Sequence, residues 1–298
     1  MIIVTTPTGD IGSQVLGTLL DTAPAAGEEL RVIVRDPAKL SDSVRDRVDV
    51  VVGSHGDAEV VNRAFAGADA VFWVVPPDPR APSLEVAYSG FTQAAAQAFT
   101  AQGVERVVGV SALGRGTSVA DHAGLVTASL AMDDLIASTG VAYRALVNPS
   151  FMDNVLRQVG SIRDRGVFTD TVAPDRTTPT AATRDIAAAA ARLLLDRSWT
   201  GDGSVPVLGP QDLSPDDMAA TMSDVLGSPV RYERQSLEKF GATLSGYGMG
   251  EAFVQGMVDM MQAKENGLDD GVARTPENAG PTTFRQWCED VLRPAVQA

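Results

Sequence analysis

The chain has 298 residues, of which 44% are hydrophobic and 21% are charged. This composition is typical of a globular protein with a large buried core, in one domain or in two closely joined ones. The formal net charge of −14 argues against nucleic acid or an anionic membrane as a partner. Cys288 is the only cysteine and the two histidines lack metal-ligand spacing, so we expect neither a disulfide framework nor a metal site.

No apolar run in the sequence approaches the length of a membrane span, and no signal-like segment precedes the first predicted strand. We therefore expect a cytoplasmic protein.

The segment 1–16 predicts a strand, a tight turn and a helix. In such a turn the first N–H groups of the helix lack intrahelical partners, and the helix dipole favours a bound anion. Gly9 lets the backbone approach a ligand, and Gly12 lets the helix pack closely against the strand. Two glycines in an ordinary loop are the alternative, because the usual first glycine is replaced. The predicted phosphate-binding residues are Thr6, Thr8, Gly9, Asp10, Ile11 and Gly12.

Strands and helices then alternate along the chain. The predicted strands are 1–4, 30–35, 48–53, 68–75, 104–110 and 141–147, with helices at 58–66, 88–102 and 125–138. This alternation predicts an α/β protein with a Rossmann-like, doubly wound parallel sheet that carries helices on both faces.

The second predicted strand ends at Arg35. At this place an acidic residue binds the ribose hydroxyls of NAD, whereas an arginine accommodates the extra phosphate of NADP. Arg35 offers a planar, permanently charged group suited to phosphate, and Lys39 adds a second charge. We therefore predict that NADP(H) is preferred over NAD(H). An ion pair between Arg35 and Asp36 is the alternative.

Loops at the carboxyl ends of parallel strands line the ligand crevice of such a sheet. Val75, Pro76 and Pro77 follow the fourth strand, and we expect them to form a stiff wall against the cofactor, with a purely structural turn as the alternative. Ser111 and Ala112 follow the fifth strand and are predicted at the same crevice.

The order of these landmarks resembles the NmrA-like family, atypical members of the short-chain dehydrogenase/reductases. Within it the chain is most similar to NADPH-dependent quinone oxidoreductases. The matching segments are 4–12, 34–39, 110–114, 148–154, 183–187 and 280–284. The resemblance implies a Rossmann domain at 1–150 that binds NADP(H), with Pro149 at the cofactor. It also implies a smaller, mostly helical substrate lobe at 151–298, of which some segments return to the sheet.

The chain departs from the common catalytic pattern of these reductases. Typical members use a tyrosine and a lysine four residues later, and the segment 123–138 contains neither. Alignment puts Ser129 where lysine or histidine is frequent, followed by the acid Asp133, and Asn148 replaces the usual arginine. These losses weaken the case for alcohol/ketone chemistry. Hydride transfer to a quinone-like acceptor demands less, because water can supply the proton.

Two residues are candidates for a direct catalytic role. Ser111 is placed to hydrogen-bond an acceptor carbonyl, although capping the strand end or touching the ribose is an equal alternative. His122 is the only imidazole near this site in the sequence, and imidazole is the side-chain group that most often acts as an acid or base in catalysis. A solvated loop histidine is the simpler interpretation of His122.

Apolar residues after the fifth and sixth strands and in the segment 240–261 are the candidates for substrate contact. Methionine and aromatic side chains can line an adaptable pocket, although helical core explains such a stripe equally well. Glycines at 246, 248 and 250 suggest a lid. We also expect a helix from Phe151 to Val159, a helix at 184–196 capped by Thr183, and a further helix capped by Ser214. The predicted substrate residues are Leu113, Phe151, Met152, Tyr247, Met249 and Phe253.

The sequence favours an NAD(P)H-dependent oxidoreductase that reduces a quinone-like or other flat, apolar carbonyl compound. An NADP(H)-binding redox sensor without turnover is the alternative, and it is favoured by the missing tyrosine and lysine. A non-redox isomerase or dehydratase would need an acid/base pair that the sequence does not reveal. The expected partner is a small-molecule substrate, with a homodimer or a protein partner left open.

Overall fold

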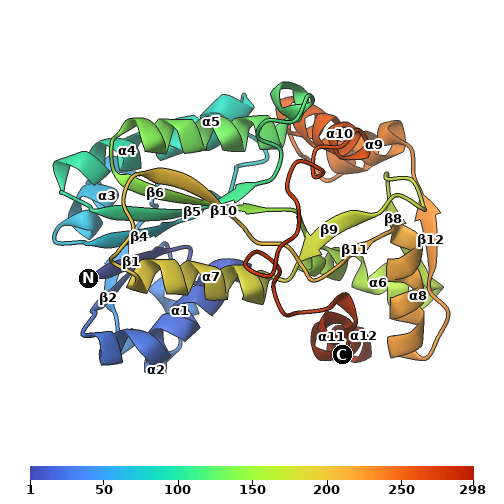
Figure 1. Ribbon diagram of the computed structural model, residues 1–298, viewed down its shortest axis with the longest axis horizontal. Helices are drawn as coiled ribbons and strands as arrows, with labels where there is room; N and C mark the ends of the chain where they lie inside the picture. Colours follow the sequence, from blue (N-terminus) through green and yellow to red (C-terminus); the bar gives the residue numbers. More distant parts are fainter.

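A seven-stranded parallel sheet forms the centre of one of the two lobes of the molecule (left in Figure 1), with the spatial order β10–β6–β5–β4–β1–β2–β3. The computed structural model describes residues 1–298, apart from the side chain of Ala25. The strands are β1 (Ile2–Thr5), β2 (Leu30–Val34), β3 (Asp49–Val52), β4 (Ala70–Trp73), β5 (Arg106–Ala112), β6 (Ala142–Asn148) and β10 (Asp202–Pro206). The predicted α/β class with a Rossmann-like parallel sheet is confirmed.

Helices bury both faces of the sheet. On one face lie α1 (Asp10–Thr22) and α7 (Thr183–Leu195), and on the other lie α3 (Ala58–Phe65), α4 (Phe91–Ala101) and α5 (Leu125–Ser138). Side chains alternate along a strand, so Ile2 and Val4 pack in the core under α1 and α7, while Ile3 packs in the core under the other three helices. Because both faces are covered, β1 is apolar at each position up to Val4.

A second lobe lies beyond the carboxyl edge of the sheet (Figure 1). A three-stranded sheet combines β7 (Ser150–Phe151), β9 (Thr178–Ala181) and β11 (Asp212–Leu213), and a parallel pair combines β8 (Val167–Asp170) with β12 (Arg231–Arg234). The helices of this lobe are η5 (Met152–Gln158), α6 (Val159–Arg165), α8 (Pro215–Leu226), α9 (Leu237–Gly246), α10 (Glu251–Glu265), α11 (Phe284–Trp287), η6 (Cys288–Leu292) and α12 (Arg293–Gln297). Two elements from the range 151–298, α7 and β10, pack in or on the central sheet instead.

Short helices occupy several connections in the first half of the chain. They are η1 (Ala23–Ala26), η2 (Pro37–Lys39), α2 (Asp42–Arg45), η3 (Val86–Gly90) and η4 (Ala120–His122). No helix among the described residues is long and apolar enough to cross a membrane.

The structure differs from the sequence prediction at three helix boundaries. Ala182, not Thr183, is the N-cap of α7, and the Thr183 hydroxyl instead accepts a hydrogen bond from Gln14 Nε2 at 2.8 Å. Phe151 lies in β7 rather than in a helix, because its backbone pairs with β9. The segment 240–261 is divided between α9 and α10, with Gly248 in a left-handed conformation at the break. The predicted Ser214 cap is confirmed and forms a capping box with Asp217.

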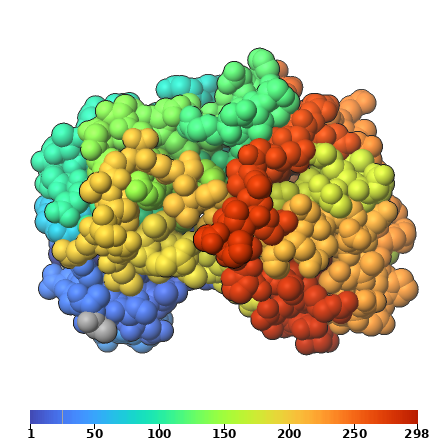
Figure 2. All heavy atoms as spheres, in the orientation of Figure 1, coloured from blue at the N-terminus to red at the C-terminus, as the bar shows by residue number. Residues whose placement is uncertain are grey.

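The segment 266–283 runs back across the boundary between the two lobes, and it is red in Figure 2. Leu208 N donates to Asn278 O at 2.8 Å, and Gly280 N donates to Leu208 O at 2.6 Å. The buried Asp185 carboxylate of α7 accepts hydrogen bonds from the backbone N–H and the hydroxyl of Thr282, at 3.1 and 2.8 Å. These bonds fix the C-terminal helices against the sheet domain.

His55 follows β3 and is buried at the carboxyl edge of the sheet. Its ring contacts Trp73 and Phe91 edge-on, at 5.1 and 4.8 Å between centroids. Its Nε2 lies 2.9 Å from Val74 O, so the neutral ring donates this bond. Burial lowers the pKa of His55 to about 4, although the bond to Val74 opposes the shift.

The tight turn after β1 predicts unequal effects for two alanine substitutions in α1. A Cβ at Gly12 would lie 2.1 Å from Thr6 O, whereas a Cβ at Gly17 would meet nothing within 4 Å. Gly12→Ala should therefore lower the free energy of unfolding by about 1–3 kcal/mol. The matched control Gly17→Ala should raise it by about 0.5–1 kcal/mol. Urea unfolding of both variants tests this, and equal effects would contradict the close packing at Gly12.

The buried His55 predicts a loss of stability in acid. The unfolded chain binds a proton at His55 below its ordinary pKa of 6.5, but the folded protein does so only near pH 4. The free energy of unfolding should thus fall by about 3 kcal/mol from this group as the pH drops from 6.5 to 4. His55→Phe should flatten this slope in urea unfolding measured across that range. His122→Phe is the matched control, because it removes an exposed histidine and leaves the buried aromatic cluster intact. An unchanged slope in His55→Phe would contradict the assignment.

Candidate active site

The turn after β1 presents backbone N–H groups at the start of α1. Thr6 has a φ of 50°, which places this threonine in the left-handed region where such turns usually carry glycine. Its carbonyl accepts a hydrogen bond from Gly9 N at 3.0 Å, and Gly9 is an N-cap without a side-chain cap bond. The first intrahelical bond runs from Ser13 N to Gly9 O. The N–H groups of residues 10–12 therefore precede the helical ladder and can bind an anion.

The parallel strands bring the predicted cofactor residues to one edge of the sheet. The Thr5 hydroxyl donates to Phe72 O at 2.8 Å and accepts from Val74 N at 3.2 Å, so it joins the ends of β1 and β4. The strand order reverses between these two strands, which is where doubly wound sheets bind ligands. The predicted residues that directly follow or end strands at this edge are Thr6, Arg35, Val75, Pro76, Pro77, Ser111, Ala112 and Pro149.

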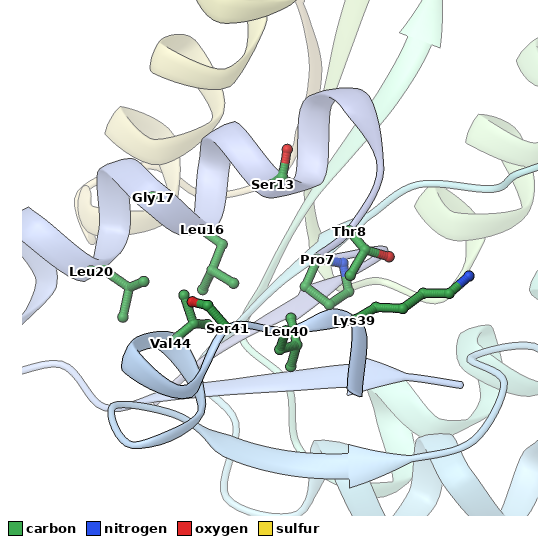
Figure 3. A pocket seen from close by; sticks show the side chains of 10 residues that line it. All are labelled: Pro7, Thr8, Ser13, Leu16, Gly17, Leu20, Lys39, Leu40, Ser41 and Val44. Carbon is green, nitrogen blue, oxygen red and sulfur yellow. The ribbon is translucent and has the colours of Figure 1, made fainter. Parts of the chain in front are cut away.

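Arg35 is exposed at the end of β2, and no ion pair to it occurs among the described residues. The Asp36 carboxylate instead accepts a hydrogen bond from Ala38 N at 3.0 Å, where it caps η2. The ion pair considered as the alternative for Arg35 is thus not formed. Lys39 is also exposed, and its side chain extends beside Thr8 (Figure 3).

A pocket of about 300 Å³ lies between α1 and the η2–α2 segment (Figure 3). Its polar groups come from Thr8, Ser13, Lys39 and Ser41, and the remaining lining residues are Pro7, Leu16, Gly17, Leu20, Leu40 and Val44. The pocket begins at the glycine turn, so an anion held at the turn would have the Lys39 side chain beside it.

A buried hydrogen-bonded network lies between β5, β6 and α5. The Ser111 hydroxyl donates to Asp133 Oδ2 at 2.5 Å, and the Tyr143 hydroxyl donates to Asp133 Oδ1 at 2.6 Å. The Ser129 hydroxyl lies 3.5 Å from that of Ser111. Ser111, Asp133 and Tyr143 are exposed by only 6%, 4% and 2%. Asn148 closes the network from the end of β6, where its Nδ2 donates to Ser111 O at 3.1 Å.

Burial controls the protonation of this network. It raises the pKa of Asp133 to about 6, while the hydrogen bonds from Ser111 and Tyr143 and the charge of Arg115 act in the opposite direction. Burial and the neighbouring Asp133 carboxylate hold the pKa of Tyr143 well above its usual value. Tyr143 is therefore a neutral hydrogen-bond donor at physiological pH.

His122 is not brought together with Ser111. It is exposed and lines a second pocket, of about 500 Å³, with Thr127, Ala128 and Ala131 of α5. Asp133 and Ser129 lie on the opposite, buried face of the same helix. A role for His122 in the chemistry of the crevice gains no geometric support.

The predicted substrate residues occupy different environments. Leu113 is buried in the core of the sheet domain, and Met152 is buried in the core of the second lobe. Phe151, Met249 and Phe253 are partly exposed, and Tyr247 is 76% exposed at the break between α9 and α10. Gly250 N, beside this break, donates to Pro79 O at 2.8 Å, so the loop after β4 contacts the α9–α10 connection.

Sequence reasoning missed the pairing of Asp133 with Tyr143. The available signal was Gly109 within the valine-rich β5, because glycine inside a strand often marks a close approach. A Cβ at Gly109 would lie 2.3 Å from the Tyr143 hydroxyl. The network therefore needs Gly109 beside Tyr143 in the adjacent strand.

Comparison with known proteins identifies relatives of this chain. The profile of the NAD(P)H-binding family matches residues 7–197. The (4-alkanoyl-5-oxo-2,5-dihydrofuran-3-yl)methyl phosphate reductase of Streptomyces griseus is 30% identical over 260 residues, covering 86% of this chain and 85% of the relative. Quinone oxidoreductase 2 of Escherichia coli is 27% identical over 273 residues, covering 91% of this chain and 89% of the relative.

Solved structures agree on the fold. The crystal structure of the NADPH-dependent quinone oxidoreductase of Escherichia coli in complex with NADPH superposes with a TM-score of 0.76 at 24% identity, covering 100% of this chain and 99% of that one. The profile match spans well over half of the chain, and the resemblance predicted from the sequence is confirmed. The chain belongs to the NAD(P)H-binding family of NmrA-like, atypical short-chain dehydrogenase/reductases, and it is an NAD(P)H-dependent oxidoreductase.

Proposed function

We propose that this enzyme uses NADPH in preference to NADH and reduces a quinone-like or other flat, largely apolar carbonyl compound. The observation that carries the cofactor preference is Arg35, a cation at the end of β2 with no ion-pair partner among the described residues. In a chain of net charge −14, an anionic cofactor must be held by such local groups against the overall field.

The residues at the carboxyl edge fit a dinucleotide phosphate. The N–H groups of residues 10–12 would hold the pyrophosphate, and the Arg35 guanidinium would hold the additional phosphate on the ribose, with Lys39 nearby. Val75, Pro76 and Pro77 would bound the crevice on the β4 side. When bound, the cofactor supplies a hydride from its nicotinamide ring.

Several features support a quinone-like acceptor. One relative is named a quinone oxidoreductase, and the name of another describes the reduction of an acyl-substituted unsaturated lactone. The segment 123–138 offers no tyrosine or lysine as a proton donor, and a conjugated acceptor spreads the negative charge that follows hydride addition. Water can then supply the proton. Phe151, Met249 and Phe253 are partly exposed and are our candidates for apolar contacts with the substrate.

The non-catalytic sensor is not favoured, since the curated relatives reported above are named as reductases or oxidoreductases. A cytoplasmic location fits the proposed activity, and a homodimer or a protein partner stays a prediction.

Reversal of the charge at Arg35 tests the cofactor preference. Arg35→Glu removes a charge-assisted contact to the ribose phosphate and adds repulsion, so NADPH should bind about tenfold to a hundredfold more weakly. NADH lacks this phosphate, and its affinity should change much less. Fluorescence titration with both cofactors measures the two affinities. Arg293→Glu, an equal charge change on the exposed surface of α12, is the matched control. Unchanged NADPH affinity in Arg35→Glu would overturn the phosphate assignment.

Consumption of NADPH tests the proposed activity. Absorbance at the nicotinamide band should stay constant with NADPH alone and should fall when a quinone is added. A panel of benzoquinones, naphthoquinones and simple aliphatic ketones should show turnover with the quinones and little with the ketones. Tight NADPH binding without turnover on any acceptor would instead support the sensor.

A further inference from the structure

The Ser111 hydroxyl already uses its single proton inside the protein. It donates to Asp133 Oδ2 at 2.5 Å, while Tyr143 donates to the other carboxylate oxygen at 2.6 Å. A hydroxyl group has one donor and two acceptor sites. With Asp133 ionised, Ser111 therefore has only lone pairs left for a further partner and cannot donate a hydrogen bond to an acceptor carbonyl.

Protonation of Asp133 reverses this arrangement. A carboxylic acid has an O–H of its own, which can be donated to Ser111 Oγ across the same short contact. Tyr143 can continue to donate to Oδ1, because that oxygen then bears no proton. The Ser111 proton is thereby released and can point out of the network.

We propose that Asp133 is a positioning residue that sets the direction of the Ser111 hydroxyl. As a carboxylate it accepts the hydrogen bond of the Ser111 hydroxyl, which leaves Ser111 only lone pairs for a ligand. As a carboxylic acid it donates to Ser111 Oγ instead and frees the Ser111 hydroxyl to donate to the oxygen of the hydride acceptor. The inference rests on the proposed function because it requires such an oxygen in the crevice. It assigns hydrogen bonds only, and the proton consumed in the reduction still comes from water.

The groups that face Asp133 determine the pH at which it is protonated. Hydroxyl donors come from Ser111 on β5 and Tyr143 on β6, and these stabilise the carboxylate. Arg115, in the loop after β5, also favours the carboxylate, whereas Asp134 on α5 opposes it. Arg115 and Asp134 form an ion pair at 2.8 Å, so their effects partly cancel. Burial outweighs these groups and brings the pKa of Asp133 to about 6, within reach of mild acid.

Infrared spectroscopy tests the hydrogen-bonded network without requiring turnover. The wild-type protein should show the carbonyl stretch of a buried carboxylic acid that disappears as the pH rises through about 6. Asp133→Asn should lack this band. Tyr143→Phe removes a donor to the carboxylate and should move the titration to higher pH. A carboxyl band that titrates in the ordinary aspartate range, or one that Tyr143→Phe leaves unmoved, would overturn the proposal.

The rate of hydride transfer tests the consequence for the reaction. In single-turnover reactions between bound NADPH and a quinone, the wild-type rate should rise on the order of tenfold as the pH falls through the titration of Asp133. In Asp133→Asn the amide Nδ2 would donate to Ser111 at every pH, so the rate should stay high throughout. Ser111→Ala should show no increase in the hydride-transfer rate at low pH and should keep the rate that the wild type has at high pH. Asp134→Asn, with the same change one residue along α5, should keep the rise in rate but move it to lower pH, because it removes a negative charge that opposes the Asp133 carboxylate.

Two failures can be told apart. If no acceptor oxidises NADPH, the proposed function fails, while the infrared titration still decides how Asp133 and Ser111 are coupled. If quinones are reduced but Asp133→Asn retains the wild-type pH profile, the proposed function stands and the positioning role is wrong. Tyr143→Phe provides the decisive comparison if Asp133→Asn does not fold, because it leaves the carboxyl group in place.

Discussion

The close packing of Gly12 against the Thr6 carbonyl is the contact on which the rest of the site depends. Any side chain at Gly12 would collide with that carbonyl, so the glycine lets the first turn of α1 pack directly against the end of β1. Thr6 adopts a left-handed conformation that costs a threonine about 1–2 kcal/mol. The Gly9 hydrogen bond to the same carbonyl and the packing of α1 against the sheet offset this cost. The result is a helix N-terminus aimed at the carboxyl edge.

Two nearby arginines in this acidic protein differ in whether they have a charged partner. Arg31, within β2, is committed to Asp49 at 2.6 Å and to the carbonyl of Ala64 at 2.7 Å. Arg35, four residues later, is exposed and carries no ion pair among the described residues, because Asp36 turns back to cap η2. Arg31 on β2 and Arg35 directly after it thus have different surroundings. The hydrogen bond from Ala38 N keeps the Asp36 carboxylate at η2 and leaves Arg35 available to a ligand.

The sequence was sufficient for six of the seven strands of the central sheet, whereas β10 comes from the half of the chain assigned to the substrate lobe. Apolar runs and glycine positions specify β1 and α1, and α5 has the predicted bounds 125–138. Parallel topology then requires Thr6, Arg35, Val75 and Ala112 to lie at one edge. The sequence could not give the partners of side chains. A threonine such as Thr183 can cap a helix, but its hydroxyl instead accepts a hydrogen bond from Gln14 of α1, a helix far away in the sequence. Phe151 forms part of a strand because its backbone pairs with β9, which follows about 30 residues later in the sequence.

The Asp133 network shows why local patterns do not reveal such a site. Ser111, Asp133 and Tyr143 come from three elements, and none breaks the pattern of its own element strongly enough to predict a contact. Burying a carboxylate is costly unless donors satisfy it, and here two hydroxyl groups do so while Gly109 leaves room for one of them. An apolar residue at this position of α5 would fill the core without the cost of burying a carboxylate. Asp133 is ionisable and lies on the buried face of α5, where its carboxyl group contacts Ser111.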